Sequence, residues 1–193
     1  MPFNIAVILG SVRHERIGLR VARYVVASLR ERGHEVTLVD PKDDFALPLL
    51  DRMYKEYAAG EAPPTLERLA GVIRAADGYV IVTAEYNHSM PPALSNLLDH
   101  FLEEYFFKPS AIVCYSAGMF GGVRAAMQLR AMVAEMGMSS IPSLLPCPKA
   151  HEMFNEDGTP TGARPGRSGA RFFDEFEWYC AALQTARAAG KPY

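Results

Sequence analysis

The chain has 193 residues, of which 49% are hydrophobic and 22% charged, and its formal net charge is -2. This is the composition of one globular domain over residues 1–193, and it excludes a disordered chain and a protein that binds nucleic acid through a basic excess. No apolar run approaches the roughly 18–20 residues that span a membrane, so we expect no membrane attachment.

Five short segments rich in Val and Ile predict β-strands. In chain order they are residues 3–9, 35–40, 78–84, 110–115 and 139–145. The near-continuous apolar content of the first four indicates strands buried on both faces, which is typical of a parallel sheet covered by helices. Pro142 interrupts the fifth segment and favours an edge position for it.

Apolar residues at helical spacing fill the gaps between these strands. The predicted helices are residues 17–32, 65–76, 91–104, 122–136 and 168–189. Strands that alternate with helices predict an α/β fold, a three-layer α/β/α sandwich with right-handed crossovers. The polar segments 41–64 and 146–167 are expected to be surface loops.

Ligands of such sheets bind at the carboxyl ends of the strands, where the strand order reverses. The first loop at this edge is residues 10–18, which include Ser11, Arg13 and Arg16 before the predicted helix. A helix N-terminus, a hydroxyl and two guanidinium groups favour a phosphate. The loop fits neither the Walker A pattern nor Gly-x-Gly-x-x-Gly, and a capped turn with two solvated arginines is the plainer alternative.

The second loop, residues 84–92, follows the third predicted strand and contains Glu85, Tyr86 and Asn87 before two prolines. Prolines stiffen a loop, so its backbone N–H groups can meet the edge of a flat ring beside Tyr86. A tight turn with Ser89 near a helix start is the alternative without a ligand.

The third loop, residues 116–122, contains three glycines that allow a ligand to approach the backbone closely. Ser116 stands at a strand-to-helix turn, as the nucleophile of a serine hydrolase does. The first glycine of Gly-x-Ser-x-Gly is missing, however, and no Asp and His follow in the required order.

Together these loops resemble the NADPH-dependent FMN reductase family, which comprises flavodoxin-like quinone, azo and chromate reductases. The opening G-S-x-R of that family is met by Gly10, Ser11 and Arg13. Its central P-E-Y-N-x-S-x-P-x-x-L-K-N-x-x-D is met by Glu85, Tyr86, Asn87, Ser89, Pro91, Leu94, Asn96 and Asp99. Its third-loop glycines and arginine are met by Gly118, Gly121, Gly122 and Arg124. The resemblance spans roughly residues 3 to 158. Ala84 and Ser95 replace a usual proline and lysine, and Arg16 and Gly18 stand where many members have serine and asparagine.

The resemblance implies a five-stranded parallel sheet of order 2-1-3-4-5 and non-covalently bound FMN. The FMN phosphate would lie on Ser11, Arg13, Arg16 and the amides near Ile17 and Gly18. The isoalloxazine would lie against Glu85, Tyr86 and Asn87, with Ser116 and Gly118 in the neighbouring loop. Amides of the Tyr86–Asn87 and Ser116–Gly118 loops would stabilise charge on the reduced ring.

The activity implied is hydride transfer from NADPH or NADH through FMN to a planar acceptor by a ping-pong mechanism. Quinones, azo dyes, nitro compounds and metal oxyanions are acceptors within the family. The flavin carries the chemistry, so no catalytic side chain is predicted. A flavodoxin-type electron carrier and an FMN-bound redox-sensing module are the alternatives.

Further expectations concern metals, assembly and location. The five histidines show no paired spacing, so no metal site is predicted. The apolar residues at the end of the 91–104 segment are either internal core or an association surface: Phe101, Leu102, Tyr105, Phe106 and Phe107. The resemblance implies a homodimer or homotetramer. Three well-separated cysteines give no disulfide framework and favour the cytoplasm.

Overall fold

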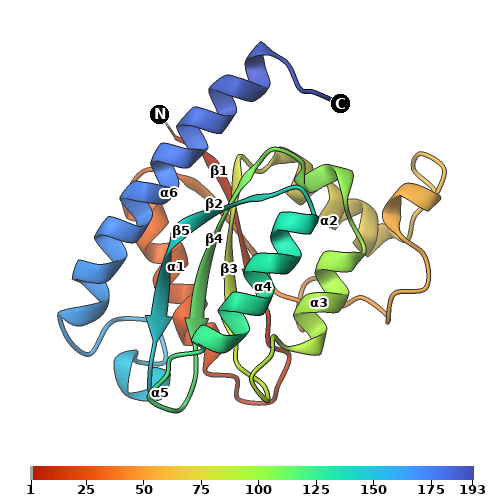
Figure 1. Cartoon of the computed structure of the whole chain (residues 1–193). Helices are drawn as coiled ribbons and strands as arrows, with labels where there is room; N and C mark the ends of the chain where they lie inside the picture. The colour runs from red at the N-terminus through yellow and green to blue at the C-terminus, as the bar shows by residue number, and fades with distance from the viewer. Residues whose placement is uncertain (1) are drawn as a thin grey trace.

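The computed structural model describes residues 2–193, apart from the side chain of Arg164, and shows a parallel sheet between two layers of helices (Figure 1). The strands are β1 (Asn4–Leu9), β2 (Glu35–Val39), β3 (Gly78–Ala84), β4 (Pro109–Tyr115) and β5 (Ser139–Cys147). They lie in the order β2-β1-β3-β4-β5, and every neighbouring pair is parallel. The predicted three-layer sandwich with strand order 2-1-3-4-5 is confirmed.

The helices cover both faces of this sheet. They are α1 (Gly18–Glu31), α2 (Pro64–Ala75), α3 (Pro92–Asp99), α4 (Val123–Glu135), α5 (Ala150–Met153) and α6 (Arg164–Ala189), with 3-10 turns at Tyr54–Glu56 and Glu103–Tyr105. Helices α1 and α6 pack on one face of the sheet, and α2, α3 and α4 pack on the other (Figure 1).

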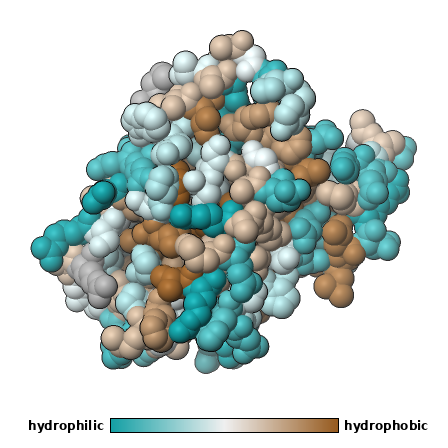
Figure 2. All heavy atoms as spheres, viewed as in Figure 1, coloured by the Kyte–Doolittle hydropathy of each residue, from teal (hydrophilic) through white to brown (hydrophobic). Residues whose placement is uncertain are grey.

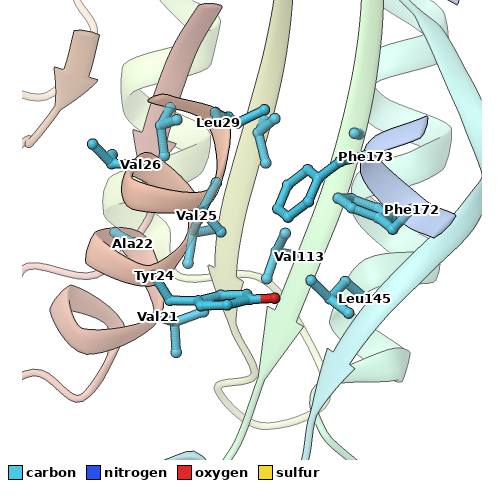
Figure 3. Close-up of a cluster of buried hydrophobic side chains, with 14 of the residues drawn as sticks. Val21, Ala22, Tyr24, Val25, Val26, Leu29, Val113, Leu145, Phe172 and Phe173 are labelled. Carbon is cyan, nitrogen blue, oxygen red and sulfur yellow. The ribbon is translucent and has the colours of Figure 1, made fainter. Parts of the chain in front are cut away.

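Each face of the sheet has its own apolar core, because β3 and β4 are buried along their whole length. The period of α1 brings Val21, Val25 and Leu29 to the sheet, and all three are fully buried. Figure 3 shows these side chains facing Val113 of β4 and Phe173 of α6. The burial of these side chains on both layers holds the carboxyl ends of the strands in fixed positions.

The fifth strand lies at an edge of the sheet, as its proline predicted. Pro142 is exposed, and the pairing of β4 with β5 is irregular between Ser110 and Ile112. A proline has no N–H group to donate to a neighbouring strand, so it costs the sheet the fewest hydrogen bonds when it lies in an edge strand.

The predicted helix over residues 91–104 is wrong at its C-terminal end, because α3 stops at Asp99. The carbonyl of His100 accepts a hydrogen bond from the Tyr54 amide of the 41–64 loop, 2.8 Å away. Beyond this point Phe101 and Tyr105 turn inward and are only 1% and 0% exposed. These two aromatic residues therefore belong to the internal core and not to an association surface.

The two long loops differ in structure. Segment 41–64 runs over the surface and carries Leu49, which is 83% exposed. On the face of the molecule shown in Figure 2, hydrophilic and hydrophobic residues are intermixed. Segment 146–167 was predicted to be a loop, but it contains α5 and the start of α6. No helix among residues 2–193 is long and apolar enough to cross a bilayer.

Candidate active site

Three loops meet beyond the carboxyl ends of β1, β3 and β4, at the lower edge of the sheet in Figure 1. They enclose a cavity of about 220 Å³. Seven of the ten predicted site residues line it: Ser11, Arg13, Arg16, Ile17, Glu85, Tyr86 and Ser116. Gly18, Asn87 and Gly118 belong to the same loops but do not line the cavity.

Four other cavities, of about 330 to 430 Å³, are larger. The two of about 420 and 430 Å³ contain no residue of the three loops. The one of about 390 Å³ includes Val12 and Pro92, and the one of about 330 Å³ includes Met119, so each borders the loops without joining all three. We place the candidate site in the smaller cavity because it lies at the strand-order reversal and because unpaired hydrogen-bond donors converge on it.

The loop after β1 supplies most of these donors. Residues 14–18 donate no backbone hydrogen bond within the described chain, whereas Leu19 and Arg20 already bond to carbonyls of the preceding turn at 3.2 and 3.0 Å. Glu15 adopts a left-handed conformation with φ 47°. Successive N–H groups in such a turn, next to the N-terminus of α1, form a concave anion site. The backbone of this loop therefore leaves several N–H groups free for a ligand.

The hydroxyl of Ser11 lies at the floor of this cavity, where the residue is only 1% exposed. It lies 2.6 Å from the hydroxyl of Tyr86 and 3.4 Å from the amide of Arg13. The first two loops are thus joined by a contact between two hydroxyl groups, each of which can donate or accept.

The two arginines of this loop have different roles. The side chain of Arg16 is 5% exposed. Its guanidinium donates to the Ser11 carbonyl at 3.3 Å and forms ion pairs with Asp40 and, at 3.1 Å, with Asp43. Arg13 is exposed at the cavity and has no carboxylate partner among residues 2–193; its guanidinium carbon lies 5.7 Å from the centre of the Tyr86 ring. The charge available to an anion is therefore that of Arg13.

The loop after β3 forms a two-residue turn in which Tyr86 and Ser89 exchange both backbone hydrogen bonds at 2.9 Å. Asn87 and His88 occupy the left-handed positions of this turn, with φ 50° and 65°. Gln128 of α4 fixes the turn through the His88 carbonyl at 2.9 Å and the Ser89 hydroxyl at 2.7 Å. Because the Tyr86 amide is used inside the turn, it is unavailable to a ring, whereas the amides of Asn87 and His88 donate no hydrogen bond within the described chain.

Glu85 faces Arg124 of α4. Its carboxylate accepts the Arg124 amide at 3.1 Å and the guanidinium at 2.9 Å. Burial raises the pKa of the Glu85 carboxyl, but these hydrogen bonds outweigh burial and the pKa is lowered. Glu85 therefore contacts the cavity as a committed, ionised group that anchors the loop to α4.

The loop after β4 is supported by the chain that follows β5. The Ser116 amide donates to the Cys147 carbonyl at 3.3 Å, and the Ser116 hydroxyl donates to the Gly118 carbonyl at 3.1 Å. The Ser116 amide is thus unavailable to a ring, which leaves the amides of Ala117 and Gly118. No histidine in the described chain bonds to the Ser116 hydroxyl, so the structure gives no support to a serine hydrolase.

Sequence reasoning missed Tyr115, the last residue of β4, which also lines the cavity. Its signal was a polar aromatic residue at the carboxyl end of an otherwise apolar strand. Among residues 2–193 no three His, Cys, Asp or Glu side chains gather closely enough to hold a metal ion.

The strand order and these three loops define a flavodoxin-like α/β protein with a loop of unpaired amides after β1. Among solved structures, the chain is similar to the flavoenzyme NAD(P)H:(acceptor) oxidoreductase FerB from Paracoccus denitrificans, with a TM-score of 0.70, 23% identity and coverage of 92% of this chain and 98% of that one. It is also similar to a mutant flavodoxin from Pseudomonas aeruginosa, with a TM-score of 0.51, 17% identity and coverage of 93% and 98%. These likenesses confirm the fold.

Sequence comparison identifies the family. The model of the NADPH-dependent FMN reductase family matches residues 3–152. A quinone reductase from Pseudomonas putida is 34% identical over 142 residues, which are 70% of this chain and 72% of that protein. An NAD(P)H-dependent FMN reductase from a Nectria species is 30% identical over 165 residues, or 79% of each chain. The chain belongs to the NADPH-dependent FMN reductase family.

Proposed function

We propose that the protein binds FMN in this cavity and passes electrons from NADPH or NADH to quinones or similar planar acceptors. The observation that carries the proposal is the run of unpaired amides at residues 14–18 beside the uncommitted guanidinium of Arg13. A phosphate monoester fits this donor set because amides, hydroxyls and a guanidinium are its usual ligands in proteins. Bound FMN supplies the hydride-accepting ring, which no side chain of the protein provides.

The proposed phosphate ligands are the Ser11 hydroxyl, the Arg13 guanidinium and the amides from Arg16 to Gly18. The ring would lie against the second loop, where Glu85 fixes the backbone and Asn87 offers its amide. Ser116 shapes the third loop, and Gly118 offers a second amide. These dipoles are fixed by hydrogen bonds before any ligand arrives, so they stabilise negative charge without reorganisation.

We further propose a ping-pong mechanism. If the ring lay against the second and third loops, the protein would cover one of its faces, and the other face would receive both substrates in turn. Such an open apolar face discriminates weakly among planar acceptors. Azo compounds, nitro compounds and metal oxyanions are therefore candidate acceptors besides quinones. Assembly as a homodimer or homotetramer and a cytoplasmic location stay predictions.

Anaerobic spectroscopy and steady-state kinetics test this function. The purified protein is expected to show the absorbance of oxidised flavin, to bleach with NADPH or NADH, and to regain colour with a quinone. Initial rates at several fixed quinone concentrations are expected to give parallel double-reciprocal lines. Intersecting lines would overturn the ping-pong order, and flavin that NAD(P)H does not bleach would favour an electron carrier or a sensor.

The resemblance assigned the Arg16 guanidinium to the phosphate, but its ion pairs favour a positioning role. Arg16 and Asp40 are each only 5% exposed, so their contact is a buried ion pair. We expect Asp40→Asn to lower the free energy of unfolding by about 2–4 kcal/mol, because it leaves a buried guanidinium with weaker compensation. FMN binding should weaken as the loop loses its anchor, as a chemical denaturation curve and a flavin titration would reveal.

Asp43→Asn is the matched control for this variant. The Asp43 side chain is 64% exposed, so its removal should cost less than about 1 kcal/mol. A tighter FMN complex in Asp40→Asn would instead identify Arg16 as a direct phosphate ligand and refute the positioning role.

A further inference from the structure

Tyr115 touches the first turn of α1 with its hydroxyl. A Cβ atom built on Gly18 would lie 2.2 Å from the Tyr115 hydroxyl oxygen and 2.7 Å from Cζ. These distances leave no room for any side chain at position 18. The hydroxyl of Tyr115 therefore occupies the space that a side chain of the first helical residue would fill.

Gly18 is needed for this contact and not for its backbone conformation. Its φ lies outside the left-handed region, and it is the first residue of a 14-residue helix. Glycine is unfavourable in a helix because it loses more conformational freedom on folding than alanine does. The close approach of Tyr115 is the feature of the structure that explains the glycine.

The Tyr115 hydroxyl differs from the hydroxyls of other buried tyrosines. Those of Tyr24, Tyr54, Tyr79 and Tyr105 each donate to a backbone carbonyl or a carboxylate. In the described chain no carbonyl or carboxylate accepts a hydrogen bond from Tyr115, although the residue is only 6% exposed. Its hydrogen-bond partner is the Ser11 hydroxyl, which can donate or accept, so the Tyr115 hydroxyl can donate to a ligand.

The surroundings of this hydroxyl suit an anion. Burial raises the pKa of Tyr115, while hydrogen bonding to Ser11 and the charges of Arg16 and Arg13 lower it. The net effect keeps the hydroxyl protonated, so it is a donor. The same cavity wall holds the Ser11 hydroxyl and the unpaired amides of the first turn of α1.

We propose that the Tyr115 hydroxyl donates a hydrogen bond to the phosphate of FMN and that Gly18 is the residue that makes room for it. The inference rests on the proposed function and deepens it, because it names a phosphate ligand from β4. The phosphate would then be held from two strands, by the loop after β1 and by the end of β4. Gly18, the first residue of α1, has no side chain that could donate a hydrogen bond, and the Tyr115 hydroxyl provides that donor.

Flavin titrations of the flavin-free protein test the proposal. Riboflavin carries the same ring as FMN but lacks the phosphate, so the ratio of the two dissociation constants measures phosphate recognition. We expect Tyr115→Phe to raise the dissociation constant for FMN about 10-fold or more, the effect of one hydrogen bond to a charged group. The dissociation constant for riboflavin should change less than about 2-fold, because the aromatic ring of residue 115 is kept.

Two further variants make the test specific. Tyr24→Phe removes an equally buried hydroxyl that donates to the Pro165 carbonyl away from the cavity, and it should leave the FMN-to-riboflavin ratio unchanged. Gly18→Ala should abolish most of the preference for FMN, because the methyl group displaces the Tyr115 hydroxyl. Thermal unfolding of each flavin-free variant checks that the fold is intact.

The outcomes separate this proposal from the proposed function. If the Tyr115→Phe variant binds FMN as the wild type does, the hydroxyl does not contact the phosphate. The proposal is also overturned if the variant loses affinity for FMN and for riboflavin equally. Wild-type protein that binds both flavins equally, or neither, overturns phosphate recognition by the cavity and with it the proposed function.

Discussion

Replacing Gly122 by alanine is expected to lower the free energy of unfolding by about 2–4 kcal/mol. Gly122 precedes α4 with φ 83°, a conformation that costs a residue with a side chain about 1–3 kcal/mol. A Cβ atom there would also lie 2.7 Å from the Tyr115 amide nitrogen and 2.8 Å from its carbonyl oxygen. Both atoms belong to the backbone of a buried strand, so they cannot move aside cheaply.

Chemical denaturation measures this loss, and Gly118→Ala is its control within the same loop. Gly118 has no atom within 4 Å of a Cβ position and no positive φ, so alanine there should change stability by less than about 1 kcal/mol. Equal stability of the two variants would mean that the turn before α4 does not need a glycine. The Gly122 variant should also lose FMN, because the third loop and the end of β4 move together.

Replacing Arg13 by alanine is expected to weaken FMN binding about 10- to 100-fold. Charge-assisted hydrogen bonds to phosphate are worth about 1.5–3 kcal/mol each, and Arg13 has no competing carboxylate in the described chain. Riboflavin binding should change little, because the ring does not contact the guanidinium in the proposed arrangement. Fluorescence titration of flavin-free protein gives both constants.

Arg23→Ala controls for the loss of one positive charge. Arg23 lies on α1, and its guanidinium donates to the Glu156 carbonyl at 2.6 Å, away from the cavity. It should leave both flavin constants unchanged. Flavin content that is the same in purified Arg13→Ala and wild-type protein would refute the assignment of the phosphate to Arg13.

These predictions depend on a distinction between committed and uncommitted groups at the carboxyl edge of the sheet. Arg16 and Glu85 are committed, because Asp40 and Arg124 already hold them. Arg13 and the amides of residues 14–18 are uncommitted and available to a ligand. Groups that already have a partner within the protein orient the loops. Groups without such a partner are available to bind the phosphate of FMN.

The sequence by itself determined the order of strands and helices along the chain, and it indicated the three loops of the candidate site. Unbroken runs of Val and Ile can be stable only where both faces of a strand are covered, so local composition was enough to predict a parallel sheet. Pro142 identified the edge strand for an equally local reason, since it has no N–H group to donate. Once the sheet was parallel, the three loops had to meet at one edge.

Only the tertiary structure decided which group in those loops has a partner. Asp40 lies 24 residues from Arg16, and Arg124 lies 39 residues from Glu85, so no local pattern reports these pairs. The end of α3 depended likewise on a hydrogen bond from the Tyr54 amide in a distant loop. The contact of Tyr115 with Gly18 joins the end of β4 to the start of α1, which are far apart in the sequence and meet only through folding of the sheet. The local sequence pattern predicts whether a side chain is buried. Its hydrogen-bond or ion-pair partner comes from a chain segment that lies beside it only after folding, so the local pattern cannot predict it.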